Sequence, residues 1–339
     1  MDHYKWSLRA GAAMILCAFL LRLTATGFFM PMVQLLTKPN IASIIIYLET
    51  GRVVRFSDSL GDSTGFVPVF YQTPAVTEPP EKETVPAETP VFTAAEAKDV
   101  EVLGAERTYN AGALMEKPLD WDLTGPEPTV LILHTHATES FTRSAGERYT
   151  ESSAFRTLSE EYNMVSVGTR VAELLKASGI NVIHDRQLHD YPSYNGSYTH
   201  ARKSIQQYLE EYPSIRLVLD LHRDASGDNS NQMTTSAVVD GERSAQIMLV
   251  VAAGTDARPV PNWQENLALG LKLHVQLERT ADGICRYVNL RASRFNQDLS
   301  PGAVLVEVGA AGNTHPEAIK AAEVLAEAII ALKPGANLP

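Results

Sequence analysis

One short segment contains three side chains that could bind a metal or transfer protons. It is His134-Thr135-His136-Ala137-Thr138-Glu139-Ser140, and it directly follows the apolar run Val130 to Leu133. Consecutive apolar residues predict a strand buried on both faces, as in the parallel sheets of α/β proteins. Such folds collect their functional side chains at the carboxyl ends of the strands. Histidine and glutamate are zinc ligands by type. This stretch therefore predicts part of a metal site at a strand end.

Two later segments repeat the pattern of an apolar strand that carries polar side chains. Leu217 to Leu221 is followed by His222, with Asp220, Arg223 and Asp224 on either side as candidate partners that would orient it. In Ala303 to Val308 a single glutamate, Glu307, interrupts the apolar residues. A buried carboxylate without a partner is costly, so we expect Glu307 to have a partner or a raised pKa. Both are marks of a general acid or base.

Together these segments predict the site of a zinc hydrolase. Two histidines and a carboxylate would bind the metal and leave a fourth position for water, whose pKa zinc lowers to about 7. Glu307 would move the protons. His136 and His222 are 86 positions apart (222 − 136), so no local motif such as HExxH holds them together. The fold has to assemble this site.

The elements that would position these residues follow a regular alternation after Pro128. Strands that alternate with amphipathic helices indicate an α/β layer fold with a largely parallel sheet. A capping box, Thr314-His315-Pro316-Glu317, opens the last helix. We expect strands over 129–133, 180–184, 217–221, 286–290 and 303–308, helices over 163–178, 202–211, 262–279 and 314–332, and strands 236–239 and 247–251 joined across Asp240-Gly241.

The amino-terminal third differs in composition from the rest of the chain. A short basic segment, 1–9, precedes the largely apolar residues 10–36, which predict an uncleaved membrane anchor because no Ala-x-Ala cleavage site stands out. Residues 37–125 comprise a membrane-proximal segment and a tether rich in Pro, Glu and Thr. The predicted organisation is therefore a cytoplasmic amino terminus, an anchor, a tether and one catalytic domain over 126–335.

Composition excludes several classes of protein. A net charge of −11 lacks the basic surface that a nucleic-acid-binding protein needs. Two cysteines, Cys17 and Cys285, are too few for a four-cysteine zinc site and do not form a CxxC motif. With Cys17 inside the predicted anchor we expect no disulfide, and we interpret Cys285 as a buried structural residue.

From about Thr129 to Leu332 the sequence resembles the stage II sporulation protein P family of cell-wall amidases. The predicted anchor and tether also resemble that family. The motifs that carry the resemblance, in chain order, are His134 to Ser140, Val167-Gly168, His189-Asp190-Tyr191-Pro192-Ser193-Tyr194-Asn195, Asp220-Leu221-His222-Arg223-Asp224, Asn296-Gln297-Asp298-Leu299-Ser300, Val306-Glu307-Val308-Gly309 and Asn313-Thr314.

The resemblance implies a zinc-dependent N-acetylmuramoyl-L-alanine amidase with an amidase-type α/β fold similar to phosphorylases and hydrolases. It implies His222 as one zinc ligand and Glu307 as the catalytic glutamate. The first histidine is His136 if the strand aligns without a gap, and His134 is then substrate-facing or an alternative ligand.

The carboxylate ligand is left open by the motifs. We favour Glu139, which lies in the first motif, over Glu151, Glu160 and Glu161. The resemblance also makes His189, Asp190 and Asn296 candidates for the substrate groove.

The same resemblance implies a place for the activity. It implies a single-pass protein of the mother-cell membrane whose catalytic domain faces the septal space and thins peptidoglycan during engulfment in endospore formation. The implied partners are stage II sporulation protein D, a lytic transglycosylase, and the membrane protein M of the same series. Two rival interpretations stay open: a peptidoglycan-binding module that does not cut, and a zinc endopeptidase that cuts peptide cross-links.

Overall fold

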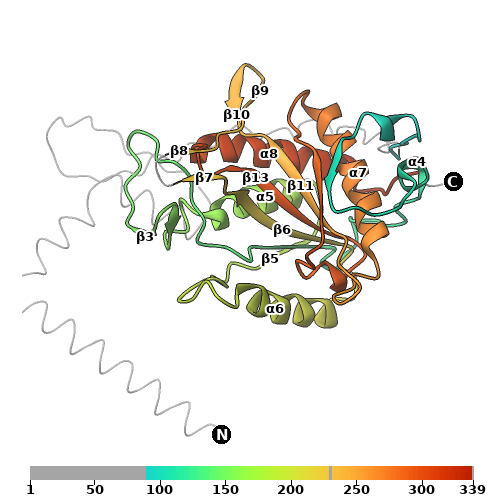
Figure 1. The fold of residues 1–339 in the computed structure, drawn as a ribbon, viewed down its shortest axis with the longest axis horizontal. Helices are drawn as coiled ribbons and strands as arrows, with labels where there is room; N and C mark the ends of the chain where they lie inside the picture. Colours follow the sequence, from blue (N-terminus) through green and yellow to red (C-terminus); the bar gives the residue numbers. More distant parts are fainter. Residues whose placement is uncertain (1–88, 229–230, 338–339) are drawn as a thin grey trace, which may run out of the picture. The chain divides into compact units, whose positions relative to one another are not determined.

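The structure is a computed structural model that describes residues 89–228 and 231–337 (Figure 1). The predicted cytoplasmic terminus, the anchor over 10–36 and the tether up to residue 88 lie outside the described residues. Within the described ranges, no helix has the length and apolar character to cross a membrane.

A seven-stranded sheet forms the centre of the domain, as the alternation of elements predicts. Each strand pairs in parallel with its neighbours except at one junction, where β11 and β13 run antiparallel. The predicted largely parallel α/β sheet is confirmed. In spatial order the strands are β1 (Val102–Gly104), β12 (Val288–Arg291), β11 (Ile247–Ala252), β13 (Ala303–Ala310), β6 (Leu217–Asp224), β2 (Val130–Leu133) and β5 (Val182–His184).

The two faces of the sheet are covered unequally (Figure 1). On one face α5 (Met164–Ala177), α7 (Trp263–Thr280) and α8 (His315–Ala331) enclose the main apolar core. On the other, α6 (Ser197–Glu211) packs over β2 and β6 against a small apolar cluster. We call these the three-helix face and the α6 face.

Alternation along the strands decides which side chains point to which face. In β13, Val304, Val306 and Val308 belong to the main core, whereas Ala303 and Leu305 belong to the clusters under the α6 face. Glu307 therefore lies on the α6 face. The same alternation in β6 places Asp220 and His222 on that face, because Val218 packs under α6.

The helix ends follow their sequence signals. Asn163 accepts a hydrogen bond from Val165 N at the start of α5, and the predicted capping box of Thr314 and Glu317 opens α8. The predicted bounds of α5, α7 and α8 agree with the structure within one or two residues. The helix predicted from residue 202 begins at Ser197 instead, directly after Gly196, whose φ of 94° ends the preceding loop.

The prediction that the tether extends to residue 125 is wrong for the part that the structure describes. Phe92 and Met115 are buried in the main core. Strand β1 forms an edge of the sheet, and a short helix, α4 (Ala111–Glu116), packs against α7. A short 3-10 helix, η1 (Glu96–Lys98), lies before them. The apolar residues of this segment occur singly or in short runs such as Val102-Leu103, without a helical or strand periodicity in the sequence.

The hairpin predicted across Asp240-Gly241 is confirmed at its turn but not in its second strand. Asp240 and Gly241 both have positive φ, as a two-residue hairpin turn of this sequence requires. The turn joins β9 (Ala237–Val239) to β10 (Glu242–Ser244), whereas 247–251 belongs to β11 of the main sheet. Two further hairpins pair β3 (Glu151–Ser153) with β4 (Arg156–Thr157) and β7 (Gly227–Asp228) with β8 (Asn231–Gln232).

Candidate metal and acid–base site

The site lies at the carboxyl ends of three neighbouring strands, β2, β6 and β13. Glu307 and His222 are register partners across β13 and β6, and Leu133, the last residue of β2, is the register partner of Asp220. Parallel strands present partner side chains on the same face, so His222 and Glu307 are neighbours on the α6 face. The three segments singled out in the sequence therefore meet at one place.

His136 and His222 face each other although they are far apart in the chain. Their ring centroids are 5.2 Å apart, with the rings nearly perpendicular. Both side chains are buried, and His136 Nδ1 has no hydrogen-bond partner. An unpartnered buried nitrogen is costly, so this atom is in position to accept a proton or a metal ion.

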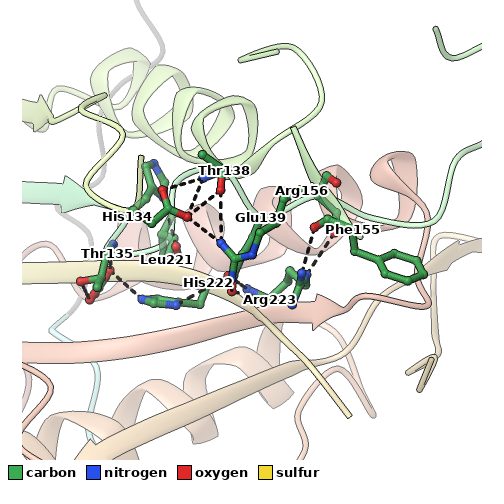
Figure 2. Close-up of polar contacts among 12 residues, drawn as sticks. His134, Thr135, Thr138, Glu139, Phe155, Arg156, Leu221, His222 and Arg223 are labelled. Carbon is green, nitrogen blue, oxygen red and sulfur yellow. Dashed lines mark hydrogen bonds and ion pairs between the residues drawn. The ribbon is translucent and has the colours of Figure 1, made fainter. Parts of the chain in front are cut away.

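Glu139 lies beside His222 and is held by two arginines (Figure 2). Its Oε2 is 3.7 Å from His222 Nδ1. Arg156 Nη2 donates to Oε1 at 3.2 Å, and the backbone N–H of Arg223 donates to Oε2 at 3.3 Å. Burial raises the pKa of the Glu139 carboxyl, but the Arg223, His222, His136 and Arg156 charges outweigh it and hold the pKa below its ordinary value. Glu139 is therefore a buried carboxylate anion.

Asp220 supports His222 from the opposite side of the ring. Its carboxylate accepts hydrogen bonds from Thr135 N at 2.7 Å and Thr135 Oγ1 at 2.6 Å, and His222 Nε2 lies 2.9 Å from Asp220 Oδ1. Burial lowers the pKa of His222, but the Asp220, Glu139 and Glu307 charges outweigh it and raise the pKa to about 9. The side chain of His222 therefore lies in a strongly negative electrostatic environment, which favours a cation.

Glu307 has the properties of an acid–base residue. Its Oε2 is buried and has no hydrogen-bond partner. Burial raises the pKa of the carboxyl to about 8, with the nearby Glu139 and Asp224 charges adding to this against the opposing His222 and Arg223 charges. A carboxyl group with a pKa near neutrality can both give and take a proton. Of the two outcomes expected for Glu307, a partner or a raised pKa, the structure shows the raised pKa.

The donors at this site fit a zinc ion by type, although the described residues contain no group of three or more His, Cys, Asp or Glu side chains arranged to hold one. Zinc bonds of about 2.0 to 2.2 Å at tetrahedral angles separate two ligand atoms by about 3.4 Å. The 3.7 Å between His222 Nδ1 and Glu139 Oε2 is too long for a hydrogen bond and close to that separation. The free Nδ1 of His136 supplies a third donor nearby.

His134 lies on the opposite side of the sheet from this site, so its alternative role as a ligand is not supported. Its Nδ1 is 3.1 Å from the carbonyl oxygen of Leu221, and its Nε2 is 2.9 Å from His184 Nε2. A carbonyl only accepts, so His134 Nδ1 donates, its Nε2 accepts, and His184 donates. Strand β2 ends at Leu133 and the chain turns, which separates His134 from His136.

The alternatives for the carboxylate ligand lie away from the histidines. Glu151 is exposed in β3 and pairs with Arg143 at 3.3 Å, so its alternative role as a ligand is not supported. Glu160 pairs with Arg186 at the surface. Glu139 alone among the candidates approaches His222.

The other predicted residues occupy supporting positions. Arg223 donates to the backbone oxygens of Ser140 and Phe155, which fixes the loop behind Glu139. Asp190 accepts from Arg156 Nη1 at 2.6 Å and from Thr138. Three more lie further out: Asp224 pairs with Arg286, His189 pairs with Asp185, and Asn296 donates to the carbonyl oxygen of Tyr198.

Two residues around the site had no clear signal in the sequence. Arg156 comes from a short hairpin in a polar stretch, and nothing in its spacing predicts that it reaches Glu139. Tyr198 lies in the first turn of α6, which the sequence predicts only from residue 202, and its ring centroid is 5.5 Å from that of His136. Tyr194 stacks on His136 at 4.4 Å and remains largely exposed.

Comparison with known proteins gives one family and one curated relative. Residues 68–330 match the family described as Stage II sporulation protein P (SpoIIP). The stage II sporulation protein P of Bacillus subtilis (strain 168) is 26% identical over 216 residues, which cover 60% of this chain and 51% of that protein. The chain therefore spans about half the length of the curated relative that it matches.

Solved structures similar to this chain include three amidases. The N-acetylmuramoyl-L-alanine amidase AmiC2 of Nostoc punctiforme is 15% identical, with a TM-score of 0.36 over 61% of this chain and 97% of that one. The CwlD amidase of Clostridioides difficile, in complex with the GerS lipoprotein, is also 15% identical, with a TM-score of 0.38 over 60% and 96%. Ami1 of Mycobacterium smegmatis is 13% identical, with a TM-score of 0.37 over 61% and 96%.

Proposed function

The chain belongs to the stage II sporulation protein P family, and from this and its site we propose that it is an N-acetylmuramoyl-L-alanine amidase of peptidoglycan. Such an enzyme hydrolyses the amide between the lactyl group of N-acetylmuramic acid and the L-alanine of the stem peptide. The observation that carries the proposal is the buried Glu307 carboxyl, whose Oε2 has no hydrogen-bond partner, beside His222 and Glu139. An acid–base carboxyl next to a cation-favouring cluster is the equipment of a metal-assisted hydrolase.

The proposed cofactor is Zn²⁺, held by His136, His222 and Glu139. The support is the donor set: two imidazoles, one with an unpartnered buried nitrogen, and a carboxylate kept anionic by its arginines. When bound, zinc would supply a Lewis acid for the amide carbonyl and a water of lowered pKa.

Glu307 performs the proton transfers in this proposal. Its carboxylate accepts a proton from the attacking water as the new carbon–oxygen bond forms. The resulting carboxylic acid gives that proton to the amide nitrogen as the carbon–nitrogen bond breaks. The products are a lactyl carboxylate on the glycan and a free amine on the peptide. A pKa raised to about 8 suits both transfers near neutral pH.

The surrounding residues keep the donors in place. Asp220, fixed by Thr135, orients the ring of His222. Arg156 and Arg223 hold Glu139 as an anion and fix its direction. Such partners of metal ligands set ring orientation and ligand basicity.

We also propose the setting that the family implies. Residues 10–36 anchor the chain in the mother-cell membrane, and the domain acts on septal peptidoglycan during engulfment. Stage II sporulation proteins D and M are the proposed partners. A cut between glycan and peptide leaves a bare glycan strand, which is a fitting substrate for a lytic transglycosylase.

The test incubates the detergent-solubilised full chain with purified sacculi, with zinc or with a chelator, and identifies the products by mass spectrometry. We expect release of stem peptides that begin with a free L-alanine amine, and loss of this release with chelator, with His222→Ala and with Glu307→Gln. Binding to sacculi without release in every condition would instead identify a peptidoglycan-binding module. Products cut only within peptide cross-links would identify an endopeptidase.

A further inference from the structure

A cleft of about 660 Å³ opens on the α6 face next to the metal and acid–base site. Tyr198 and Arg202 of α6 form one wall. Arg294, Phe295 and Asn296, from the segment between β12 and the short 3-10 helix η2 (Gln297–Leu299), form the other. We call it the arginine cleft, because Arg258, from the loop after β11, is its third arginine.

The arginines of the cleft carry more positive charge than their partners neutralise. Arg202 is bound by Asp298 through two hydrogen bonds, at 2.9 and 2.8 Å. Arg294 Nε lies 3.8 Å from the same carboxylate, and its side chain is 39% exposed. Arg258 is exposed, and no ion pair within 4.0 Å is found for it in residues 89–228 and 231–337. One carboxylate thus serves two of three guanidinium groups, in a chain whose net charge is −11.

The cleft is continuous with the catalytic residues through Tyr198. The ring of Tyr198 packs edge-on against His136, with ring centroids 5.5 Å apart, and at a tilt against Phe295, with centroids 5.7 Å apart. Asn296 donates to the Tyr198 carbonyl oxygen and accepts from Arg202 Nη1, so both walls are fixed to each other. Only the ring of Tyr198 therefore separates a molecule in the cleft from His136, a proposed zinc ligand.

We propose that the arginine cleft binds a free carboxylate of the substrate's peptide, recognised by Arg258 and Arg294. This inference rests on the proposed amidase function and names the part of the substrate that occupies this side of the site. Guanidinium groups bind carboxylates through paired, charge-assisted hydrogen bonds. Arg202, already engaged by Asp298, keeps the wall rigid rather than binding the ligand itself.

The chemistry of the substrate favours the peptide over the glycan. A strand of N-acetylated sugars whose lactyl groups are all joined to peptide is uncharged, whereas stem peptides carry free carboxylates on their side chains and termini. A cationic cleft in an acidic protein attracts the anionic part of a substrate and orients it. The cleft therefore places the peptide on the Tyr198 side of the scissile amide.

The test compares two soluble substrates for the full chain: a muramoyl tetrapeptide with free carboxylates and the same compound with its carboxylates amidated. For Arg258→Gln with Arg294→Gln we expect KM for the free-acid substrate to rise about tenfold, since hydrogen bonds between charged groups are lost. We expect kcat to stay within about twofold, and the amidated substrate to be unaffected. The matched control is Arg216→Gln, because Arg216 is an exposed arginine directly before β6.

Equal losses on both substrates, or no loss on either, would overturn the proposal. A binding measurement separates it from the amidase proposal. The muramoyl tetrapeptide with free carboxylates should bind the Glu307→Gln variant. Its affinity should be about tenfold lower for a variant that also carries Arg258→Gln and Arg294→Gln. Arginine-dependent binding supports the cleft even if the wild type cuts neither substrate. Arginine-dependent binding of peptide-free glycan, with its lactyl carboxylates, in place of the tetrapeptide would overturn the assignment to peptide.

Discussion

The two faces of the sheet differ in what they do with buried polar groups. On the three-helix face, strands present valine, leucine and isoleucine to α5, α7 and α8, and the polar side chains of His134, His184 and Lys272 have hydrogen-bond partners. On the α6 face, Asp220, His222 and Glu307 lie at neighbouring strand ends, and Glu307 Oε2 is left without a partner. Strands β6 and β13 therefore supply side chains both to the core and to the site.

This difference shows how alternation lets one strand serve stability and function separately. Three helices bury enough apolar surface on one face to hold the fold. The other face can then keep unpaired, charged groups that cost stability. We expect substitutions on the α6 face to change activity with little effect on stability, and substitutions on the three-helix face to do the reverse.

The largest expected effect tests this separation at adjacent residues of β13. Glu307→Gln should lower the amidase rate by about 10³-fold, the range for loss of a general acid–base residue. Its free energy of unfolding should not fall, because a buried carboxyl is replaced by a neutral group of the same shape. Val306→Ala, which faces the helices, should cost about 2 kcal/mol of stability and leave the activity of folded protein intact. Urea unfolding and initial rates are measured on both variants. A variant that changes both the stability and the activity would contradict the separation of the two faces.

The second prediction concerns Lys272, a buried lysine on the three-helix face. Lys272 is fully buried, and its Nζ donates to the carbonyl oxygen of Leu114 at 2.8 Å, at the end of α4. Burial, with a smaller contribution from the Lys117 charge, lowers the pKa of Lys272 to about 8. Between pH 8 and its ordinary pKa near 10.5, the unfolded chain holds this proton and the folded chain does not. Stability therefore rises with pH across that window.

The Lys272→Met variant lacks this titration. Relative to the variant, the wild type should gain about 2 to 3 kcal/mol of unfolding free energy as pH rises from 8 to 10.5. Urea unfolding at a series of pH values checks this, with Lys176→Met at an exposed position of α5 as the control for loss of a lysine. A gap between wild type and variant that stays constant from pH 8 to 10.5 would show that folding does not lower the pKa of Lys272.

The third prediction compares two aspartates on β6. Asp220→Asn removes the charge that orients His222 and should lower zinc affinity about 10- to 100-fold, as for other partners of metal ligands. Asp224→Asn, four residues along the same strand, removes a carboxylate that pairs with Arg286 and should change zinc affinity less than about threefold. Competition with a chromophoric chelator measures both. Equal effects of the two changes would mean that general negative charge, rather than the orientation of His222, sets the affinity.

The sequence was enough to predict the strands and helices around the site, and the reason is visible in particular residues. The apolar runs at 130–133, 217–221 and 303–308 are buried strands, and the capping box at Thr314 is formed. His222 and Glu307 could be singled out because each is a polar residue that an apolar strand would otherwise exclude. His222 and Glu307 lie side by side because β6 and β13 are neighbours in the sheet. The alternation of strands and helices predicts a largely parallel sheet but not this order of its strands.

What could not be predicted depends on how loops turn. His134 and His136 differ by two positions and share a face only in a continued strand, but the strand ends at Leu133 and they separate. Arg156 reaches Glu139 from a hairpin whose position depends on tertiary packing. The segment 89–125 joined the domain through contacts of single residues with distant helices and strands, which leave no periodic signal.

The smallest expected effect lies where the two faces are coupled, at Gly168 of α5. A Cβ at this position would lie 2.5 Å from His134 Nε2 and 2.6 Å from His184 Nε2, so Gly168→Ala must displace the histidine pair. Overpacking costs about 1 to 3 kcal/mol, and the better helix propensity of alanine returns up to about 1 kcal/mol, so we expect a net loss of about 1 to 2 kcal/mol. Gly270→Ala in α7, whose Cβ would meet one methyl group of Val251 at 3.0 Å, is the matched control and should be nearly neutral.

Because His134 also donates to the carbonyl oxygen of Leu221, next to His222, Gly168→Ala should weaken zinc binding a few-fold, whereas Gly270→Ala should not. Loss of stability without any change in zinc affinity would show that the three-helix face can shift without moving the site on the other side of the sheet.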